Sequence, residues 1–161
     1  MAEPLSALSQ HPDRAGIDQA GAEMMAMIDT LWPITRSLQG PGIRQTLEII
    51  GDRIGGLEIT KVATGAKVLD WIVPDEWHPR AAFVETPTGE RICDLADNNL
   101  HLVGYSVGVD TTMPLAELQS HLYSLPEQPD AIPYVTSYYE RKWGFCLPHR
   151  QRETLAAGSY R

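Results

Sequence analysis

The densest aromatic segment of this chain runs from Pro133 to His149, with the sequence PYVTSYYERKWGFCLPH. Aromatic side chains bury a large area at a small loss of rotamer freedom, so their density indicates a packed hub or a contact surface. We weigh packing and docking above direct substrate contact, and choose as the candidate contact or docking surface Tyr138, Tyr139, Trp143 and Phe145.

Composition narrows the functional classes. A chain of 161 residues with 43% apolar residues suits one soluble domain, or a core with a small inserted module. The net charge of −8 and the lack of a long basic run disfavour nucleic acid and anionic membranes as partners. No apolar run approaches the roughly 20 residues of a membrane helix, and the start does not resemble an export signal. Two distant cysteines fit a reducing compartment, so we expect a cytoplasmic protein.

The first third of the chain has helical periodicity. Residues 1–16 are polar and proline-containing, which predicts a disordered lead-in. A helix is expected from Asp18 to Pro33, and a second one after Gly40-Pro41-Gly42, ending at Gly55-Gly56. Each should bury one apolar stripe in a helical hairpin. The stripes are Met24, Met27, Ile28 and Leu31 in the first helix, and Ile43, Leu47, Ile50 and Ile54 in the second.

From Leu57 onwards the pattern favours short strands. Alternating or β-branched runs predict strands at 57–59, 68–73, 81–86, 90–94, 100–109, 134–138 and 143–146. Pro87-Thr88-Gly89 and Asp97-Asn98-Asn99 are typical of turns. Short helices are expected around Leu115–Leu122 and from Pro148 to Gly158. The predicted fold is therefore α+β: an N-terminal helical hairpin, a compact antiparallel β-rich module and a short C-terminal helix.

Metal-ligating patterns are weak. His149 and Glu153 share a helix face at i, i+4, but two ligands do not make a site, and a surface pair is the simpler interpretation. Oxygen ligands for a hard cation occur close together, but without the spacing of a calcium loop, so turn formation is the better explanation. These residues are Asp94, Asp97, Asn98 and Asn99.

Other local chemistry is equally limited. Cys93 and Cys146 have no recognisable activating base, and Cys146 is expected in the core beside its aromatic neighbours. Gly40-Pro41-Gly42 could present backbone N–H groups to an anion, but a plain loop explains it as well. A groove of tryptophans and carboxylates could hold a sugar or an amine, although core tryptophans beside surface charges are commoner. That set is Trp71, Trp77, Asp70, Asp75, Glu76 and Asp94.

Four segments, taken in order, resemble one family. They are LWPITRSLQGPGIRQTLEII, VLDWIVPDEWHPRAAFVETPTGERICDLADNNLHLVGYS, LAELQSHLYSLPEQPDAIPYVTSYY and RKWGFCLPHRQ. The chain is similar, from residue 22 to residue 161, to aminopeptidase-like proteins with an M28-type zinc peptidase domain. That domain is interrupted by a small β-rich domain of unknown function, of the DUF4910 or DUF2172 type. The resemblance implies that 17–56 begins the peptidase scaffold, 57–129 is the inserted module and 130–161 returns to the scaffold.

The resemblance also implies where catalysis resides. The family's metal-binding motifs are not found in this sequence, so we expect the N-terminal portion of a zinc-dependent hydrolase that is inactive alone. Zinc is then a cofactor of the full-length family, with none expected in this chain. The implied partner is the catalytic half of the same protein, with peptide as substrate, and exposed docking surface predicts self-association. The alternative is a stand-alone module that binds peptide or saccharide without catalysis.

Overall fold

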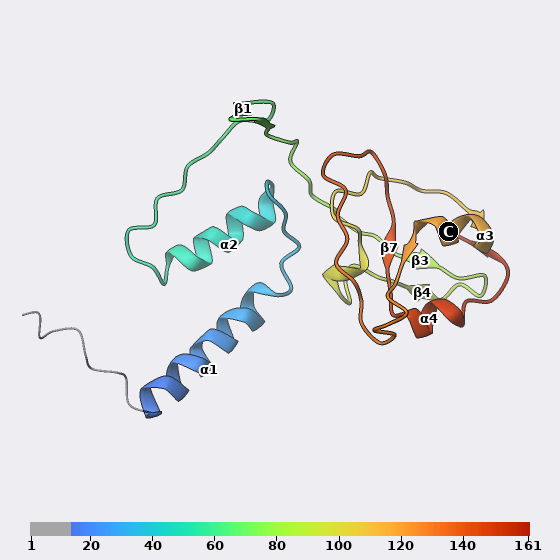
Figure 1. Ribbon diagram of the computed structural model, residues 1–161, viewed down its shortest axis with the longest axis horizontal. Helices are drawn as coiled ribbons and strands as arrows, with labels where there is room; N and C mark the ends of the chain where they lie inside the picture. Colours follow the sequence, from blue (N-terminus) through green and yellow to red (C-terminus); the bar gives the residue numbers. More distant parts are fainter. Residues whose placement is uncertain (1–13) are drawn as a thin grey trace, which may run out of the picture. The chain divides into compact units, whose positions relative to one another are not determined.

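The computed structural model describes residues 14–161, which divide into two compact units. One unit ends at Pro33 and the other comprises Ile34–Arg161, and Figure 1 shows the elements of each. The chain is a mixed α+β protein with N-terminal helices, small antiparallel sheets and a short C-terminal helix, so the predicted fold class is confirmed.

The first unit contains helix α1, Arg14–Leu31, which ends two residues before Pro33 as the sequence predicts. None of its residues is buried, so the expectation of a buried stripe on this helix is wrong. The predicted lead-in lies mostly outside the described residues, but residues 14–16 already belong to α1.

Helix α2, Pro41–Gly51, opens the second unit with proline in its first turn. Gly40 precedes it at φ 127, and a Cβ atom there would lie 2.7 Å from the carbonyl oxygen of Trp77. Only glycine permits both this backbone angle and this close approach. The predicted stripe is half-buried at Ile43, Leu47 and Ile50 and exposed at Ile54, and the one buried residue of α2 is Thr46. The expected fully buried apolar face is therefore not present.

A hairpin follows, formed by β1 (Lys67–Val68) and β2 (Trp71–Ile72). The sequence predicted one strand over 68–73, and the structure corrects this. Leu69 has a left-handed φ of 56, so the chain reverses through Leu69-Asp70 instead of continuing. Backbone hydrogen bonds between Gly65 and Val73 and between Val73 and Ala66, both 2.9 Å, extend the hairpin.

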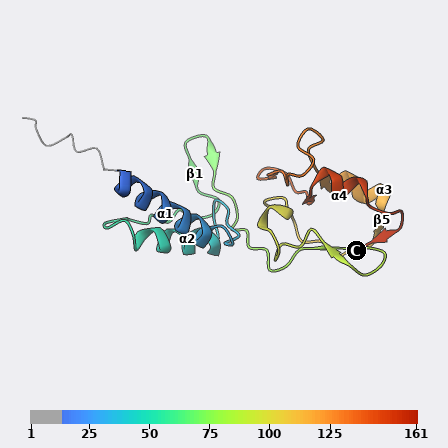
Figure 2. The ribbon, with the colours of Figure 1, turned by 90° about the horizontal axis from the view of Figure 1, so that it is seen from below.

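Three further pairs of short strands build the rest of the second unit (Figure 2). The antiparallel pairs are β3 (Val84–Glu85) with β4 (Arg91–Ile92), and β5 (Met113–Pro114) with β8 (Ser159–Tyr160). The third pair, β6 (Leu122–Tyr123) with β7 (Phe145–Cys146), is parallel. The module is therefore not wholly antiparallel. Parallel pairing needs a long crossover connection, and residues 124–144 provide it.

These pairs surround the main hydrophobic core. It consists of Val84, Cys93, Leu118, Leu122, Phe145, Leu147 and Tyr160. Three of these residues, Phe145, Leu147 and Tyr160, come from the last 30 residues of the chain, which therefore pack into the same core as residues 84–122. The proposed boundary between an inserted module, 57–129, and a return to the peptidase scaffold, 130–161, concerns longer proteins and stays a prediction.

Several predicted strands are shorter than expected or absent. No strand is assigned at 57–59 in the described chain, and within 100–109 there are only isolated bridges at Leu102 and Gly104. Positive φ values at Cys93 (53) and Tyr105 (64) turn the chain at these points and prevent long strands. The segment 134–138 contributes a single bridge, between Thr136 and Gly104.

Helical turns complete the unit: α3 (Leu115–Leu118), the 3-10 turns η1 (Asn99–His101) and η2 (Gln119–His121), and α4 (His149–Glu153). Pro148 directly precedes α4, as predicted. Among residues 14–161, no helix combines the length and the apolarity that crossing a membrane requires.

Candidate functional site

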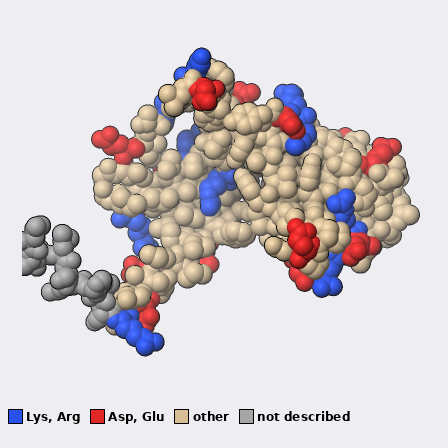
Figure 3. Space-filling model, viewed as in Figure 1, with Lys and Arg blue, Asp and Glu red and all other residues tan. Residues whose placement is uncertain are grey.

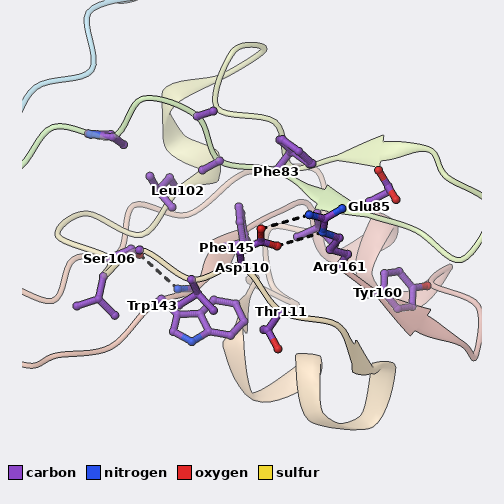
Figure 4. Close-up of a pocket in the computed structure, with 18 of the residues that line it drawn as sticks. Phe83, Glu85, Leu102, Ser106, Asp110, Thr111, Trp143, Phe145, Tyr160 and Arg161 are labelled. Carbon is purple, nitrogen blue, oxygen red and sulfur yellow. Dashed lines mark hydrogen bonds and ion pairs between the residues drawn. The ribbon is translucent and has the colours of Figure 1, made fainter.

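A cleft of ≈ 770 Å³ lies in the second unit, between the β3–β4 hairpin, the loop 106–111 and strand β7 (Figure 4). Its volume is in the range of small-molecule sites. The wall is apolar where Val84, Leu118 and Phe145 of the core reach it. Its rim carries polar side chains, including His78, Arg80, Glu85, Asp110, Thr111 and Arg161. The cleft therefore combines apolar contact area with convergent polar groups.

Asp110 and Arg161 form an ion pair at this rim, shown by dashed lines in Figure 4. The Nε and Nη2 atoms of Arg161 donate to the two carboxylate oxygens of Asp110 at 3.0 and 3.2 Å. These hydrogen bonds lower the pKa of the Asp110 carboxyl. Arg161 is also fixed through its backbone, because it exchanges hydrogen bonds of 2.7 and 3.0 Å with Glu85. The rim is thus positioned by the strand pairing around it.

Two aromatic side chains of the cleft have defined partners. Arg91 lies over the ring of Phe83, with its guanidinium carbon 3.8 Å from the ring centroid. Trp143 stacks on His121 with a centroid distance of 3.7 Å and meets Phe145 edge-on at 6.4 Å. Stacking fixes one face of Trp143 against the protein and leaves its edges for contact at the cleft.

The four aromatic residues chosen from the sequence fall into two groups. Trp143 and Phe145 line the cleft, and Phe145 is also a core residue at 8% exposure. Tyr138 and Tyr139 do not line it. They end a run of ring contacts that begins with Trp77 stacked on Tyr105 at 5.7 Å and continues from Tyr105 to Tyr138 at 5.0 Å. Because Trp77 also lines the cleft, this run of rings reaches the cleft at one end, and a shared contact surface of the four residues stays a prediction.

The tyrosine run is partly exposed. Tyr139 is 81% and Tyr134 69% exposed, and the hydroxyls of Tyr134 and Tyr138 hydrogen-bond at 3.2 Å. This hydrogen bond raises the pKa of Tyr134. Tyr105 combines a left-handed backbone with a buried hydroxyl that has no hydrogen-bond partner within residues 14–161. A left-handed backbone at a non-glycine residue and a buried hydroxyl without a partner each lower the stability of the fold. Both occur at Tyr105, in the middle of this run of ring contacts.

Metal ligation does not fit the residues present. Within the part of the chain that the structure describes, no three His, Cys, Asp or Glu side chains gather as a metal site would need. His149 and Glu153 do meet, with Nε2 and Oε1 3.7 Å apart. The Nδ1 atom of His149 lies 2.9 Å from the Ser124 hydroxyl, so this histidine ties α4 to the loop after β6.

The two cysteines are core residues, and Cys146 is fully buried as predicted. Burial raises the pKa of Cys93 to about 12 and that of Cys146 to about 11. A thiolate is the reactive form, so neither thiol is a nucleophile near neutral pH.

Turn formation accounts for the acidic cluster. Asp94 accepts a hydrogen bond from the backbone of Ala96 at 2.9 Å, and Asn98 caps η1 by accepting from Leu100 at 2.9 Å. In the predicted groove of tryptophans and carboxylates, Trp77 lines the cleft but Trp71 does not. Glu76 instead pairs with Arg44, with Nη2 and Oε2 3.2 Å apart.

Charges are mixed on the face seen in Figure 3, where Lys and Arg alternate with Asp and Glu without a broad patch of either sign. The sequence reasoning missed the charged and aromatic rim residues Arg80, Phe83, Arg91, Asp110 and Arg161. Phe83 and Arg91 could have been found, because the Pro87-Thr88-Gly89 turn sets the register that makes them diagonal neighbours. Asp110 and Arg161 are 51 positions apart, and no local signal connects them.

Comparison with known proteins shows what this arrangement is similar to. A protein of Clostridium acetobutylicum described as a "Putative polysaccharide biosynthesis protein with aminopeptidase-like domain" is 44% identical over 142 residues, 88% of this chain and 32% of the relative. A crystal structure described as a "putative peptidase" from Clostridium acetobutylicum matches with a TM-score of 0.84 and 44% identity, over 88% of this chain and 33% of the other.

The chain thus spans about a third of the length of the relatives it matches. The match to a family model covers the strand pairs β3–β4, β5–β8 and β6–β7, the main hydrophobic core and the cleft. Residues 76–161, more than half of the chain, match the family described as "Domain of unknown function (DUF2172)", and the chain therefore belongs to this family.

Proposed function

We propose that this chain is the accessory N-terminal part of an M28-like, zinc-dependent aminopeptidase-like hydrolase and supplies none of its metal ligands. The observation that carries the proposal is the 44% identity to a relative described as having an aminopeptidase-like domain, two thirds of which lies outside the match. A zinc peptidase needs a metal to lower the pKa of bound water and a carboxylate as base. Residues 14–161 offer no cluster that could hold that metal.

The role of the chain in such a protein is positioning. Its cleft can hold part of a peptide or of a hydroxylated ligand, because apolar walls and polar rim groups converge there. The chain itself would then bind and orient, while hydrolysis depends on groups supplied by the remaining part of the longer polypeptide.

The test compares the 161-residue chain with the longer Clostridium protein on aminoacyl-p-nitroanilide substrates, and measures the metal content of both. We expect chelator-sensitive hydrolysis that zinc restores in the longer protein, and neither stoichiometric metal nor hydrolysis in the chain. Metal-independent activity of the longer protein, or activity of the chain alone, would sink the proposal.

A second function, a binding module without catalysis, is favoured by the cleft itself. Trp77 and Trp143 are the fluorescent reporters, because both line the cleft. Titration with oligosaccharides and short peptides should change tryptophan emission in the unmodified chain and in Trp71→Phe, but not in the double variant Trp77→Phe/Trp143→Phe. An absence of saturable change in every variant would exclude this function.

A further inference from the structure

The β1–β2 hairpin presents apolar side chains to solvent at its tip. Leu69 is 89% exposed, Ile72 56% and Val68 41%. The base of the hairpin is fixed, because Val73 is 4% exposed and pairs with Ala66 through a backbone hydrogen bond of 2.9 Å. A well-anchored hairpin thus carries a leucine with almost its whole side chain in water.

The turn chemistry at this tip is unusual. Val68 pairs with Trp71, so Leu69 and Asp70 are the two central residues of a two-residue turn. Leu69 has φ 56, whereas Asp70 is not among the residues with positive φ. Turns of this kind prefer glycine at the first central position, since a Cβ atom is strained there. The sequence places a large apolar residue where folding alone would favour glycine.

Strain and exposure together indicate a function for this side chain. A two-stranded hairpin is marginal by itself, so a partner that covers its tip also stabilises it. Among the described residues the tip stays uncovered, as the exposed fractions show.

We propose that the β1–β2 hairpin is a docking element whose Leu69 inserts into an apolar pocket on the aminopeptidase-like part of a longer polypeptide. This rests on the proposed function, because that function supplies the partner. A match over 142 of the 161 residues spans the region of the hairpin, and about two thirds of the relative lies outside the match. The hairpin lies outside residues 76–161, so it is separate from the family domain and its cleft.

Charge favours a protein pocket over a lipid surface as the occupant. The tip contains Asp70, and Asp75 and Glu76 follow directly after the hairpin, in a chain of net charge −8. Anionic bilayers attract clustered basic residues, and Lys67 is the one basic residue of the segment 67–76.

The first experiment uses Leu69→Gly in two contexts: the 161-residue chain, and a chimera in which this chain replaces the matching third of the Clostridium protein. In the chain alone, glycine removes the strain of a Cβ atom at positive φ, so the thermal midpoint of unfolding should rise or stay unchanged. In the chimera, the lost anchor should lower the midpoint by several degrees. Two variants serve as controls. Leu69→Met should leave the thermal midpoint of the chimera unchanged. Val109→Ala, at an exposed apolar site outside the hairpin, should change the thermal midpoint by the same amount in the chain and in the chimera. Equal effects of Leu69→Gly in both contexts would overturn the proposal.

A binding measurement decides the matter if the chimera does not fold. The chain is titrated with the Clostridium protein from which the matching third has been deleted, and Leu69→Gly should weaken binding at least tenfold. An absence of binding by the unmodified chain contradicts the proposal. Two other results would also contradict the proposal. One is that the chain co-sediments with phosphatidylcholine or phosphatidylglycerol vesicles and Leu69→Gly abolishes this co-sedimentation. The other is that the chain self-associates and Leu69→Gly abolishes this self-association. None of these readouts involves hydrolysis, so a failure here is distinct from a failure of the peptidase assay.

Discussion

Residues 34–75 and 76–161 belong to one unit but differ sharply in what they bury. Nine of the ten buried hydrophobic residues lie in 76–161, and Val73 is the exception. The exposed large hydrophobic residues of the unit are concentrated in 34–75: Leu38, Ile54, Leu57, Ile59, Val62, Val68, Leu69 and Ile72. In the second region they are Val109, Tyr134 and Tyr139.

The difference shows that apolar content alone does not make a core. In 76–161, strand pairs bring residues distant in sequence against one another, and their apolar faces cover each other. In 34–75, one helix and one hairpin have apolar residues that the rest of residues 34–161 leaves exposed, and domains need two packed layers. The first region is thus a surface, and the second is a self-contained packing unit.

Thiol accessibility should separate the two regions most strongly. Burial raises the pKa of Cys93 to about 12 and of Cys146 to about 11, so both are protonated and shielded at pH 8. A cysteine introduced by Val62→Cys should react with a thiol reagent on the order of 10³-fold faster than the native pair, which must wait for unfolding. Comparable rates would show that the core of 76–161 opens readily.

Truncation of a core side chain tests the same contrast through stability. Leu147→Ala removes a side chain with 0% exposure and should lower the free energy of unfolding by about 3 kcal/mol. Ile54→Ala, at 55% exposure, should change it by less than about 0.5 kcal/mol. Urea denaturation followed by fluorescence measures both. Similar losses would mean that residue 54 is buried in solution.

Two glycines provide a smaller test. A Cβ atom at Gly144 would lie 2.7 Å from the carbonyl oxygen of His121 and 2.7 Å from Cε2 of Tyr123, whereas nothing lies within 4 Å of one at Gly55. Gly144→Ala should therefore cost about 2 kcal/mol by overpacking. Gly55→Ala should be within about 0.5 kcal/mol of neutral. If both substitutions were neutral in urea denaturation, residues 121–123 would have to be able to shift away from position 144.

The smallest effect concerns the exposed Asp110–Arg161 pair. Arg161 lowers the pKa of Asp110 in the folded chain. The ion pair therefore stabilises the fold fully at pH values above the pKa of this carboxyl in the unfolded chain. This contribution disappears as pH falls through the lower folded pKa. Carbon-13 NMR titration should show Asp110 titrating below the ordinary aspartate range, and Arg161→Ala should return it there. An unchanged Asp110 titration in Arg161→Ala would contradict the pairing.

The sequence predicted the fold better where local rules decide. Pro33 limits α1, Pro148 precedes α4, and the turn at Pro87-Thr88-Gly89 sets the β3–β4 hairpin. It failed at Leu69, in an exposed hairpin turn, and at Tyr105, whose hydroxyl is buried: at both, a non-glycine residue has a positive φ and interrupts a run that looks like a strand. Composition does not report such angles, because leucine and tyrosine ordinarily avoid them.

The candidate site was predictable only in part, for the same reason. Trp143 and Phe145 stand out as aromatics near a core strand, and both reach the cleft. The remaining walls come from residues 77–91 and 106–111, which the parallel β6–β7 pair and the β5–β8 pair bring to the same place. Such pairings have no local sequence signature, since Leu122 and Phe145, and likewise Met113 and Tyr160, lie far apart in the sequence.

The backbone pairing between Glu85 and Arg161 has a topological consequence. The two residues exchange hydrogen bonds of 2.7 and 3.0 Å, so the first strand of the core and the final residue run side by side. Residues 85–161 are therefore closed into a loop by a backbone contact between the two ends of this segment, and the entropic cost of closing such a loop grows only slowly with its length.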